Sequence, residues 1–207
     1  MKNLSILTIA AMALIFSGVF FDAKAQYISG KVGYTSFSDV ATTPGSFAFS
    51  LAYGFGGDVS ETVGLRGEFE YANLGNWNTK INSYTDVNNW EKGKSSTNVN
   101  AYLANVYIDF LKDFKVKPYI SASGGFVNTS TKNNYEYKWK IGVVQEEGME
   151  VGTDSLLSIA YGFGAGASTD ITKSLKADAG VRLVFASIEG ESFNKIINAS
   201  VGLRYEF

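Results

Sequence analysis

Apolar and polar positions alternate strictly over several stretches of the chain. The clearest stretch is 47–56, FAFSLAYGFG, in which large apolar side chains occupy every second position and Ala, Ser or Gly stand between them. Stretches 63–71, 177–185 and 199–207 alternate in the same way, with charged residues or Gly at most of the intervening positions. Because successive side chains of a β-strand point to opposite faces, this period of two predicts strands with one apolar face and one polar or small-residue face.

Eight strands are predicted, at 27–36, 46–56, 62–73, 97–110, 116–128, 155–168, 174–186 and 195–207. Tight turns are expected near Asp58, Asp113 and Asp170, and longer polar loops at 37–45, 74–96, 129–154 and 187–194. A short repeat, LAYGFG at 51–56 and IAYGFG at 159–164, falls in the second and sixth strands. Short turns at one end and long loops at the other are typical of outer-membrane barrels. We therefore predict an all-β fold, an eight-stranded antiparallel up-and-down transmembrane β-barrel; a secreted soluble barrel is the alternative, since alternation does not reveal which face is wet.

The first 25 residues have the layout of a secretory signal peptide. Lys2 supplies a positive start, residues 4–21 are mostly apolar, and Ala23-Lys24-Ala25 fits the small-x-small cleavage rule. We expect cleavage before Gln26, which leaves 26–207 as a single barrel domain; a retained membrane helix is the alternative reading of this segment. After Gln26 no apolar run approaches the roughly 20 residues that a membrane-spanning helix needs.

The C-terminal segment SVGLRYEF, 200–207, alternates and ends on an aromatic residue. It resembles the signal by which the insertion machinery recognises bacterial outer-membrane barrels, which implies an assembly role for Gly202, Tyr205 and Phe207. The segments NVYIDF at 105–110 and VKPYI at 116–120 resemble parts of small OmpA/OmpX-type, porin-family-like barrel domains. The resemblance implies a monomer in the bacterial outer membrane, whose partners are outer-membrane lipid, lipopolysaccharide and the barrel-assembly machinery.

The polar face of the predicted strands carries charges of both signs. Inward positions are assigned to Lys31, Arg66, Lys117, Lys176, Arg182 and Arg204, and to Glu68, Glu70, Asp109, Asp178 and Glu206. We single out Arg66, Glu68, Glu70, Asp178, Arg182 and Arg204 as an interior charge network. The network either fills the barrel with ion pairs or lines a gated pore; an eight-stranded barrel is just wide enough to be filled by side chains, which favours the first. Tyrosines near strand ends are expected at the membrane interface, namely Tyr27, Tyr34, Tyr53, Tyr71, Tyr102, Tyr119 and Tyr205.

Composition argues against catalysis. The chain has no His and no Cys, so the commonest general base, the commonest metal ligand and the thiol nucleophile are missing. The enzymes known among outer-membrane barrels rely on a histidine, so we predict no enzyme, no cofactor and no metal. The acidic residues Glu146, Glu147, Glu150 and Asp154 lack the spacing of a dedicated Ca²⁺ loop and are expected to be solvated. A net charge of -2 also speaks against a nucleic-acid partner.

Aromatic residues in the predicted loops are the remaining candidates for a binding role. Trp77, Tyr84 and Trp90 lie in the predicted loop 74–96, and Tyr135, Tyr137 and Trp139 alternate with charged residues in the predicted loop 129–154. That alternation indicates that the fifth and sixth strands continue as a hairpin above the membrane. The aromatic side chains either contact an extracellular host or surface partner or pack the hairpin itself. The predicted function is structural or surface interaction (membrane integrity, adhesion or surface antigen), and the alternative is a narrow porin-like channel or a lateral route for small molecules.

Overall fold

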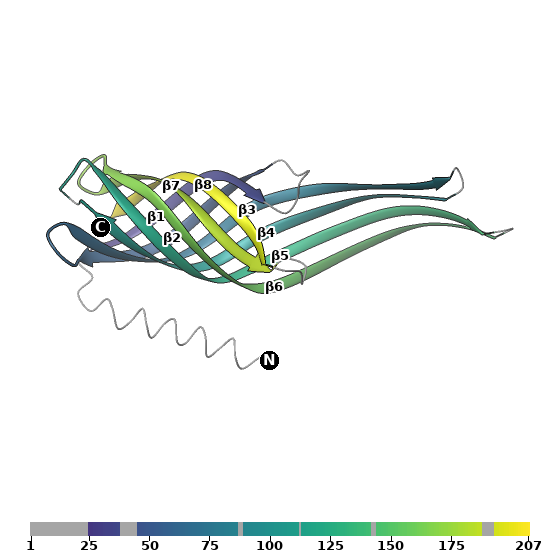
Figure 1. The fold of residues 1–207 in the computed structure, drawn as a ribbon, viewed down its shortest axis with the longest axis horizontal. Helices are drawn as coiled ribbons and strands as arrows, with labels where there is room; N and C mark the ends of the chain where they lie inside the picture. Colours follow the sequence, from purple (N-terminus) through teal and green to yellow (C-terminus); the bar gives the residue numbers. More distant parts are fainter. Residues whose placement is uncertain (1–24, 38–44, 87–88, 112, 142–143, 188–192) are drawn as a thin grey trace, which may run out of the picture.

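The eight predicted strands form a closed barrel in the computed structural model, which describes residues 25–37, 45–86, 89–111, 113–141, 144–187 and 193–207 (Figure 1). The strands are β1 (Ala25–Phe37), β2 (Ser46–Asp58), β3 (Val63–Asp86), β4 (Asn89–Phe110), β5 (Val116–Ile141), β6 (Val144–Asp170), β7 (Leu175–Ser187) and β8 (Phe193–Glu206). Each strand is antiparallel to the next, and β1 pairs with β8 to close the ring. The predicted fold class is therefore confirmed. The predicted signal peptide, apart from Ala25, lies outside the described residues.

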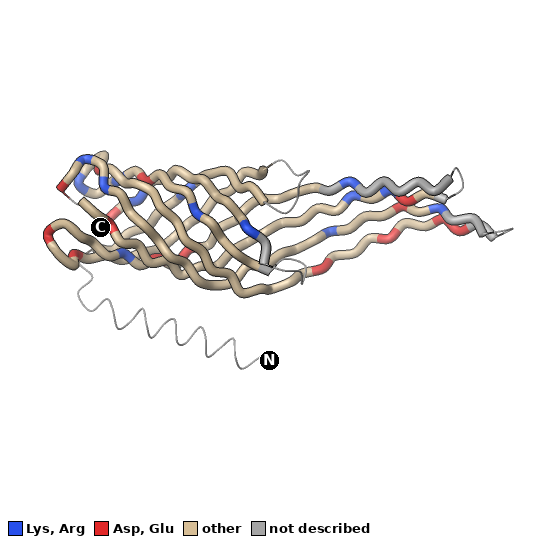
Figure 2. Tube along the Cα trace, viewed as in Figure 1, with Lys and Arg blue, Asp and Glu red and all other residues tan. Residues whose placement is uncertain are grey.

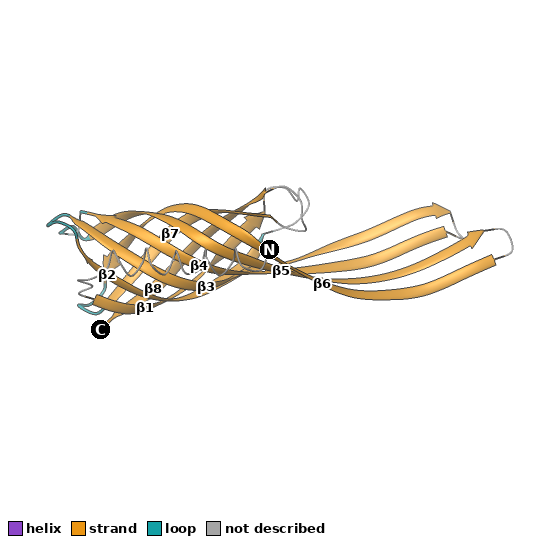
Figure 3. Ribbon diagram, turned by 90° about the horizontal axis from the view of Figure 1, so that it is seen from below, coloured by secondary structure: helices purple, strands orange, loops and turns teal. Residues whose placement is uncertain are grey.

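Strand length divides the barrel into two halves. β1, β2, β7 and β8 have 13 or 14 residues, whereas β3 to β6 have 22 to 27. β3 pairs with β2 only as far as Asn73, and β6 pairs with β7 only from Ala160 onward. Beyond those residues β3 to β6 continue as a four-stranded sheet that projects from one end of the barrel, which we call the extension (Figures 1 and 3).

The extension corrects two predicted loops. Segments 74–96 and 129–154 lie largely in strands, so only the hairpin expected from Tyr135, Tyr137 and Trp139 is confirmed. The reason is that both faces of the extension are mostly polar, and strands without an apolar face have no visible period of two. Their antiparallel register is nevertheless continuous, because backbone hydrogen bonds do not depend on side-chain polarity.

Large apolar side chains cover the outside of the ring. Phe47, Leu51 and Phe163 are about three-fifths exposed to the surroundings, and most other large apolar side chains of the same parity on these strands are also exposed. Among the described residues, no helix is long and apolar enough to cross a membrane. A closed ring pairs every strand with two neighbours, which is what hydrocarbon requires of the backbone. An apolar exterior on a closed ring is therefore the surface expected to face lipid.

The end of the barrel opposite the extension is formed by tight connections. The amide of Val59 donates to the carbonyl of Val63 at 3.0 Å, and the amide of Ile171 donates to the carbonyl of Leu175 at 2.9 Å, so the turns predicted near Asp58 and Asp170 are confirmed. Outer-membrane barrels have short turns on the periplasmic side. We therefore call this end periplasmic, and the extension extracellular.

Apolar side chains fill the barrel interior next to the extension. This apolar layer consists of Phe37, Ala72, Leu74, Trp77, Val99, Ala101, Leu103, Val127, Ala160, Val184, Ala186 and Ile196. The rings of Phe37 and Trp77 meet at a centroid distance of 4.4 Å and an angle of 57°. Trp77 points inward because a β-bulge between Asn73 and Gly75 shifts the phase of β3. Gly75 has φ of 111°, and its amide donates to Asn73 Oδ1 at 3.2 Å.

Candidate functional site

Below the apolar layer the interior is a network of buried charges. Its centre is Glu68 on β3, whose side chain is fully buried. The carboxylate accepts hydrogen bonds from Tyr107 Oη at 2.8 Å, Tyr27 Oη at 3.1 Å and Lys31 Nζ at 3.3 Å. These donors stand on β4 and β1, so Glu68 joins three strands. A buried carboxylate is tolerated only when donors and a cation surround it, and Glu68 has both.

Arg66 joins β3 to β4 through a two-pronged contact. Its Nε and Nη2 donate to the two carboxylate oxygens of Asp109 at 2.6 and 2.8 Å. The guanidinium also lies over two rings, 4.5 Å from the centroid of Tyr107 and 5.3 Å from that of Tyr119. This arrangement satisfies both the planar donors and the cationic face of the guanidinium inside the barrel.

A third ion pair crosses the interior. Arg182 on β7 donates from Nη1 to Glu70 on β3 at 2.6 Å, and Asn105 Nδ2 on β4 donates to the same carboxylate oxygen at 2.6 Å. The two residues of this ion pair are 112 positions apart in the sequence. The contact therefore bridges strands that are not neighbours in the ring.

Near the periplasmic rim the buried pair Arg204 and Asp178 meets the more exposed Lys176 and Glu206. Arg204 Nε lies 3.7 Å from both Asp178 and Glu206, and Lys176 Nζ lies 2.9 Å from Glu206. A cavity of about 190 Å³ opens at this end, lined in part by Arg66 and Arg204. The structure thus places all six residues of the predicted network inside the barrel, each facing an opposite charge.

The rim also holds Asp170, at the end of β6. Partial burial opposes ionisation of this carboxyl, but a hydrogen bond from Lys117 and the charge of Lys176 outweigh the burial and lower the pKa of Asp170 below its ordinary value. The side chain of Asp170 is 46% exposed, so this pair belongs to the wet end of the network.

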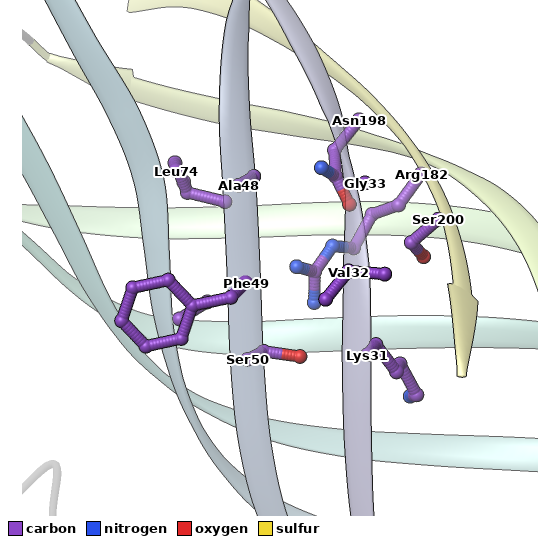
Figure 4. Close-up of a pocket in the computed structure, with 11 residues that line it drawn as sticks. Lys31, Val32, Gly33, Ala48, Phe49, Ser50, Leu74, Arg182, Asn198 and Ser200 are labelled. Atoms are coloured by element: carbon purple, nitrogen blue, oxygen red, sulfur yellow. The ribbon is translucent and has the colours of Figure 1, made fainter. Parts of the chain in front are cut away.

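Little space remains in the middle of the barrel. One void of about 10 Å³ lies between Lys31, Ser50, Arg182 and Asn198 (Figure 4), and a second of about 30 Å³ lies beside Tyr107 and Glu70. The first is about the size that holds a single water molecule. Together with the apolar layer above, these side chains leave no wide passage through the part of the interior that the structure describes.

Two of the seven tyrosines expected at the membrane interface point inward instead. Tyr27 and Tyr119 are 1% and 8% exposed and belong to the interior, as does Tyr107, which the sequence reasoning did not select. The other five (Tyr34, Tyr53, Tyr71, Tyr102 and Tyr205) face outward. The alternation of β1 already indicates the inward direction of Tyr27, because this residue lies on the same face of the strand as Ser29 and Lys31.

Of the residues of the predicted assembly signal, Gly202 and Tyr205 lie on β8 and Phe207 directly follows it. Gly202 faces inward, where a Cβ would come within 2.4 Å of the carbonyl oxygen of Gly30. Tyr205 and Phe207 point outward, 50% and 65% exposed, and the amide of Phe207 donates to the carbonyl of Gln26 at 3.0 Å. Their recognition by an assembly machinery remains a prediction.

The aromatic residues proposed for partner contact do not form one patch. Trp77 is buried inside the barrel, so the prediction that it meets a partner is wrong. Tyr135 packs over Gly93 and Tyr137 over Gly148, where an added Cβ would lie 2.3 and 2.6 Å from the tyrosine atoms. Trp90 remains partly exposed on the extension. The side chains of Tyr84 and Trp139 lie outside what the structure describes.

The extension has two chemically different faces. We call the face that continues the barrel exterior the outer face, and the face that continues the barrel interior the inner face. Figure 2 shows charges of both signs along the four strands, and the strand register sorts them. Among the described side chains, the outer face carries Lys80, Lys92, Lys94, Lys132 and Lys138 with Glu136 and Glu147, and the inner face carries Glu91, Glu146, Glu150 and Asp154 without a cation.

The sorting also separates the acidic residues considered for Ca²⁺. Glu147 points to the opposite face from Glu146, Glu150 and Asp154, because adjacent residues of a strand alternate. No group of three or more metal-ligating side chains is found among the described residues. Glu147 instead forms an ion pair with Lys138.

A closed eight-stranded ring with an apolar exterior and a filled, charged interior defines a small β-barrel of the bacterial outer membrane. A family model described as Opacity family porin protein matches residues 66–207. The chain therefore belongs to the Opacity family of porin proteins. No curated protein sequence matches it.

Solved structures of other outer-membrane proteins are similar to this chain, and Neisserial surface protein A shares its fold. Neisserial surface protein A is 19% identical, with a TM-score of 0.52 over 88% of this chain and 97% of that one. The attachment invasion locus protein Ail of Yersinia pestis is 13% identical, with a TM-score of 0.44 over 88% and 97% of the two chains. The N-terminal barrel domain of OprF of Pseudomonas aeruginosa is 14% identical, with a TM-score of 0.39 over 89% and 100%.

Proposed function

We propose that the protein is a non-enzymatic surface protein, in which the barrel anchors an extracellular interaction surface formed by the extension. The observation that carries the proposal is the continuation of β3 to β6 beyond the ring. A barrel needs no such strands to close, so their role lies outside the membrane. Adhesion or surface-antigen display fits this geometry better than membrane integrity alone, which the ring would serve without an extension.

The edges of the extension support the proposal. Among the described strands, residues 75–86 of β3 pair only with β4, and residues 144–159 of β6 pair only with β5. Unpaired backbone groups along such an edge can accept an extended segment of a partner as an added strand. Met149 and Val151 stand beside the β6 edge with exposures of 66% and 68%, which adds apolar contact area for that strand.

Acidic side chains restrict which strand can be added. Glu146, Glu150 and Asp154 follow one another along the inner face of β6. A second β6 edge would bring like charges together, which disfavours pairing between identical edges. The β6 edge thus favours a neutral or basic extended segment. The same charges disfavour aggregation through pairing with a second copy of this edge.

A channel is the weaker alternative. The apolar layer and the small voids below it argue against a conducting path, and β1 pairs with β8 from Tyr27 to Phe37 without a gap for lateral exit. The interior also argues against catalysis, since its carboxylates are held by cations or phenols and no histidine is present.

The test combines conductance with adhesion. Purified full-length protein in planar bilayers is expected to show no defined unitary currents, and such currents would overturn the filled-barrel interpretation. Bacteria that express the protein are expected to adhere to cultured epithelial cells more than bacteria that express a variant in which both extension hairpins are cut back to short turns. The shortened variant must retain heat-dependent gel mobility, which reports a folded barrel. Equal adhesion by both would contradict a role for the extension.

A further inference from the structure

Among its described side chains, the outer face of the extension holds three lysines without an ionic partner. Lys80 on β3 and Lys94 on β4 stand directly opposite each other, and Lys94 pairs with Asn134, which places Lys132 on the adjacent diagonal position of β5. None of the three forms an ion pair with a described carboxylate. We call these residues the lysine cluster. Like charges directly opposite each other on neighbouring strands destabilise a sheet. An external anion that lies over the lysine cluster would relieve this repulsion and stabilise the sheet.

The other two lysines of this face differ. Lys138 forms an ion pair with Glu147, and Lys92 stands opposite Glu136 with its ammonium 5.2 Å from the ring centroid of Trp90. The same face therefore holds lysines with an interaction partner toward its outer end and the lysine cluster closer to the membrane. This difference provides a matched internal comparison.

The position of the cluster indicates which anion it meets. On β3 and β4 the apolar exterior ends at Tyr71 and Tyr102, and an amide band follows, in which Asn73 Nδ2 donates to Asn98 at 3.3 Å and to Asn100 at 2.9 Å. The outer face then continues upward without a break in the strands. At about 3.4 Å per residue, Lys94 lies roughly 27 Å along β4 beyond Tyr102. This distance from the apolar exterior of β4 is why we expect the lysines to lie beyond the acyl chains, at the level of the head-group sugars.

We propose that the lysine cluster binds the anionic core sugars of lipopolysaccharide in the surrounding outer leaflet. Those sugars carry phosphate and carboxylate groups, and clustered lysines next to a membrane-spanning wall bind such head groups. The contact holds the outer face of the extension toward the membrane and leaves the acidic inner face and the free edges toward the medium. The inference goes beyond the proposed function, because lipopolysaccharide belongs to the protein's own membrane.

The test uses deacylated lipopolysaccharide, which keeps its phosphorylated core but cannot bind through acyl chains. Its affinity for the full-length protein in detergent is measured by titration calorimetry for K94Q/K132Q and for the matched pair K92Q/K138Q. Both variants lose two charges from the same face. K94Q/K132Q is expected to weaken binding by roughly tenfold, and K92Q/K138Q by less than about twofold.

Further measurements test whether the positive charges of the lysine cluster and the phosphates of the core account for the binding. K94R/K132R is expected to retain binding, and enzymatic removal of the core phosphates is expected to reduce binding to the wild-type protein. Rising salt weakens the interaction, because exposed charges are screened. Equal losses in the two glutamine pairs, or indifference to dephosphorylation, would overturn the proposal.

Heparin serves as a second probe. If the cluster binds heparin but not deacylated lipopolysaccharide, it belongs to a soluble sulfated polysaccharide and the proposal is wrong. All variants keep both hairpins, so their adhesion to epithelial cells tests the proposed function separately from lipopolysaccharide binding.

Discussion

Arg66 and Asp109 form a bidentate ion pair inside the barrel, with N–O distances of 2.6 and 2.8 Å between neighbouring strands β3 and β4. Both side chains are almost entirely screened from solvent. Removal of one partner from such a pair leaves an uncompensated buried charge, which costs more than the pair contributes.

Arg66→Ala is therefore expected to destabilise the barrel by about 3–5 kcal/mol, because Asp109 loses its cation and Glu68 loses a nearby one. The measurement is urea unfolding in lipid vesicles, followed by heat-dependent gel mobility. Lys117→Ala provides the comparison, because its partner Asp170 is 46% exposed and the loss should stay below about 1 kcal/mol. An unchanged unfolding midpoint for Arg66→Ala would contradict a structural role for the network.

The apolar layer leads to a second prediction. Trp77 is 9% exposed and packs on Phe37, whereas Trp90 lies partly exposed on the extension. Trp77→Ala is expected to cost about 3–5 kcal/mol of unfolding free energy through the cavity it leaves. Trp90→Ala should cost less than about 1 kcal/mol, as exposed substitutions usually do. Similar losses for both would show that Trp77 does not act as core.

Gly202 provides a test of close packing within the predicted assembly signal. A Cβ there would lie 2.4 Å from the backbone oxygen of Gly30, which cannot move without disturbing β1. Gly202→Val is expected to lower the yield of heat-modifiable folded protein in membranes several-fold, roughly the effect of 1–3 kcal/mol of overpacking. Gly152→Val is the control, since nothing lies within 4 Å of its added Cβ. Equal yields from the two variants would rule out this packing constraint.

Alternation along the sequence predicted the ring and which charged side chains point into it, but not which of these side chains meet. Alternation in stretches such as 47–56 distinguishes the two faces of a strand. It therefore predicts the strands of the ring and the inward direction of Arg66, Glu70 and Arg182. It does not predict the contact between Glu70 and Arg182, because this contact joins strands 112 residues apart across the interior. The extension was missed for the opposite reason: its backbone pairing continues while its side-chain pattern loses apolar contrast.

Trp77 was assigned to a surface loop because the bulge at Gly75 is invisible in the alternation. A one-residue insertion exchanges the two faces of every later position in the strand. The φ of 111° at Gly75, and the 2.5 Å between its added Cβ and Ser46 Cβ, explain why glycine occupies that position. The bulge thus decides which side chains of β3 complete the apolar layer.

Deletion of Gly75 and insertion of a residue after it together test this explanation. The deletion is expected to restore regular pairing with Leu74 opposite Val99, which leaves Trp77 opposite Thr97 and facing inward. Insertion of one Ala between Asn76 and Trp77 is expected to move Trp77 to the outer face. In a W90F/W139F background Trp77 is the only tryptophan, since the chain has 3. Its fluorescence should stay blue after the deletion, but after the insertion it should shift to longer wavelength and become accessible to a water-soluble quencher. An unshifted emission after the insertion would mean that packing against Phe37, rather than the phase of the strand, sets the direction of Trp77.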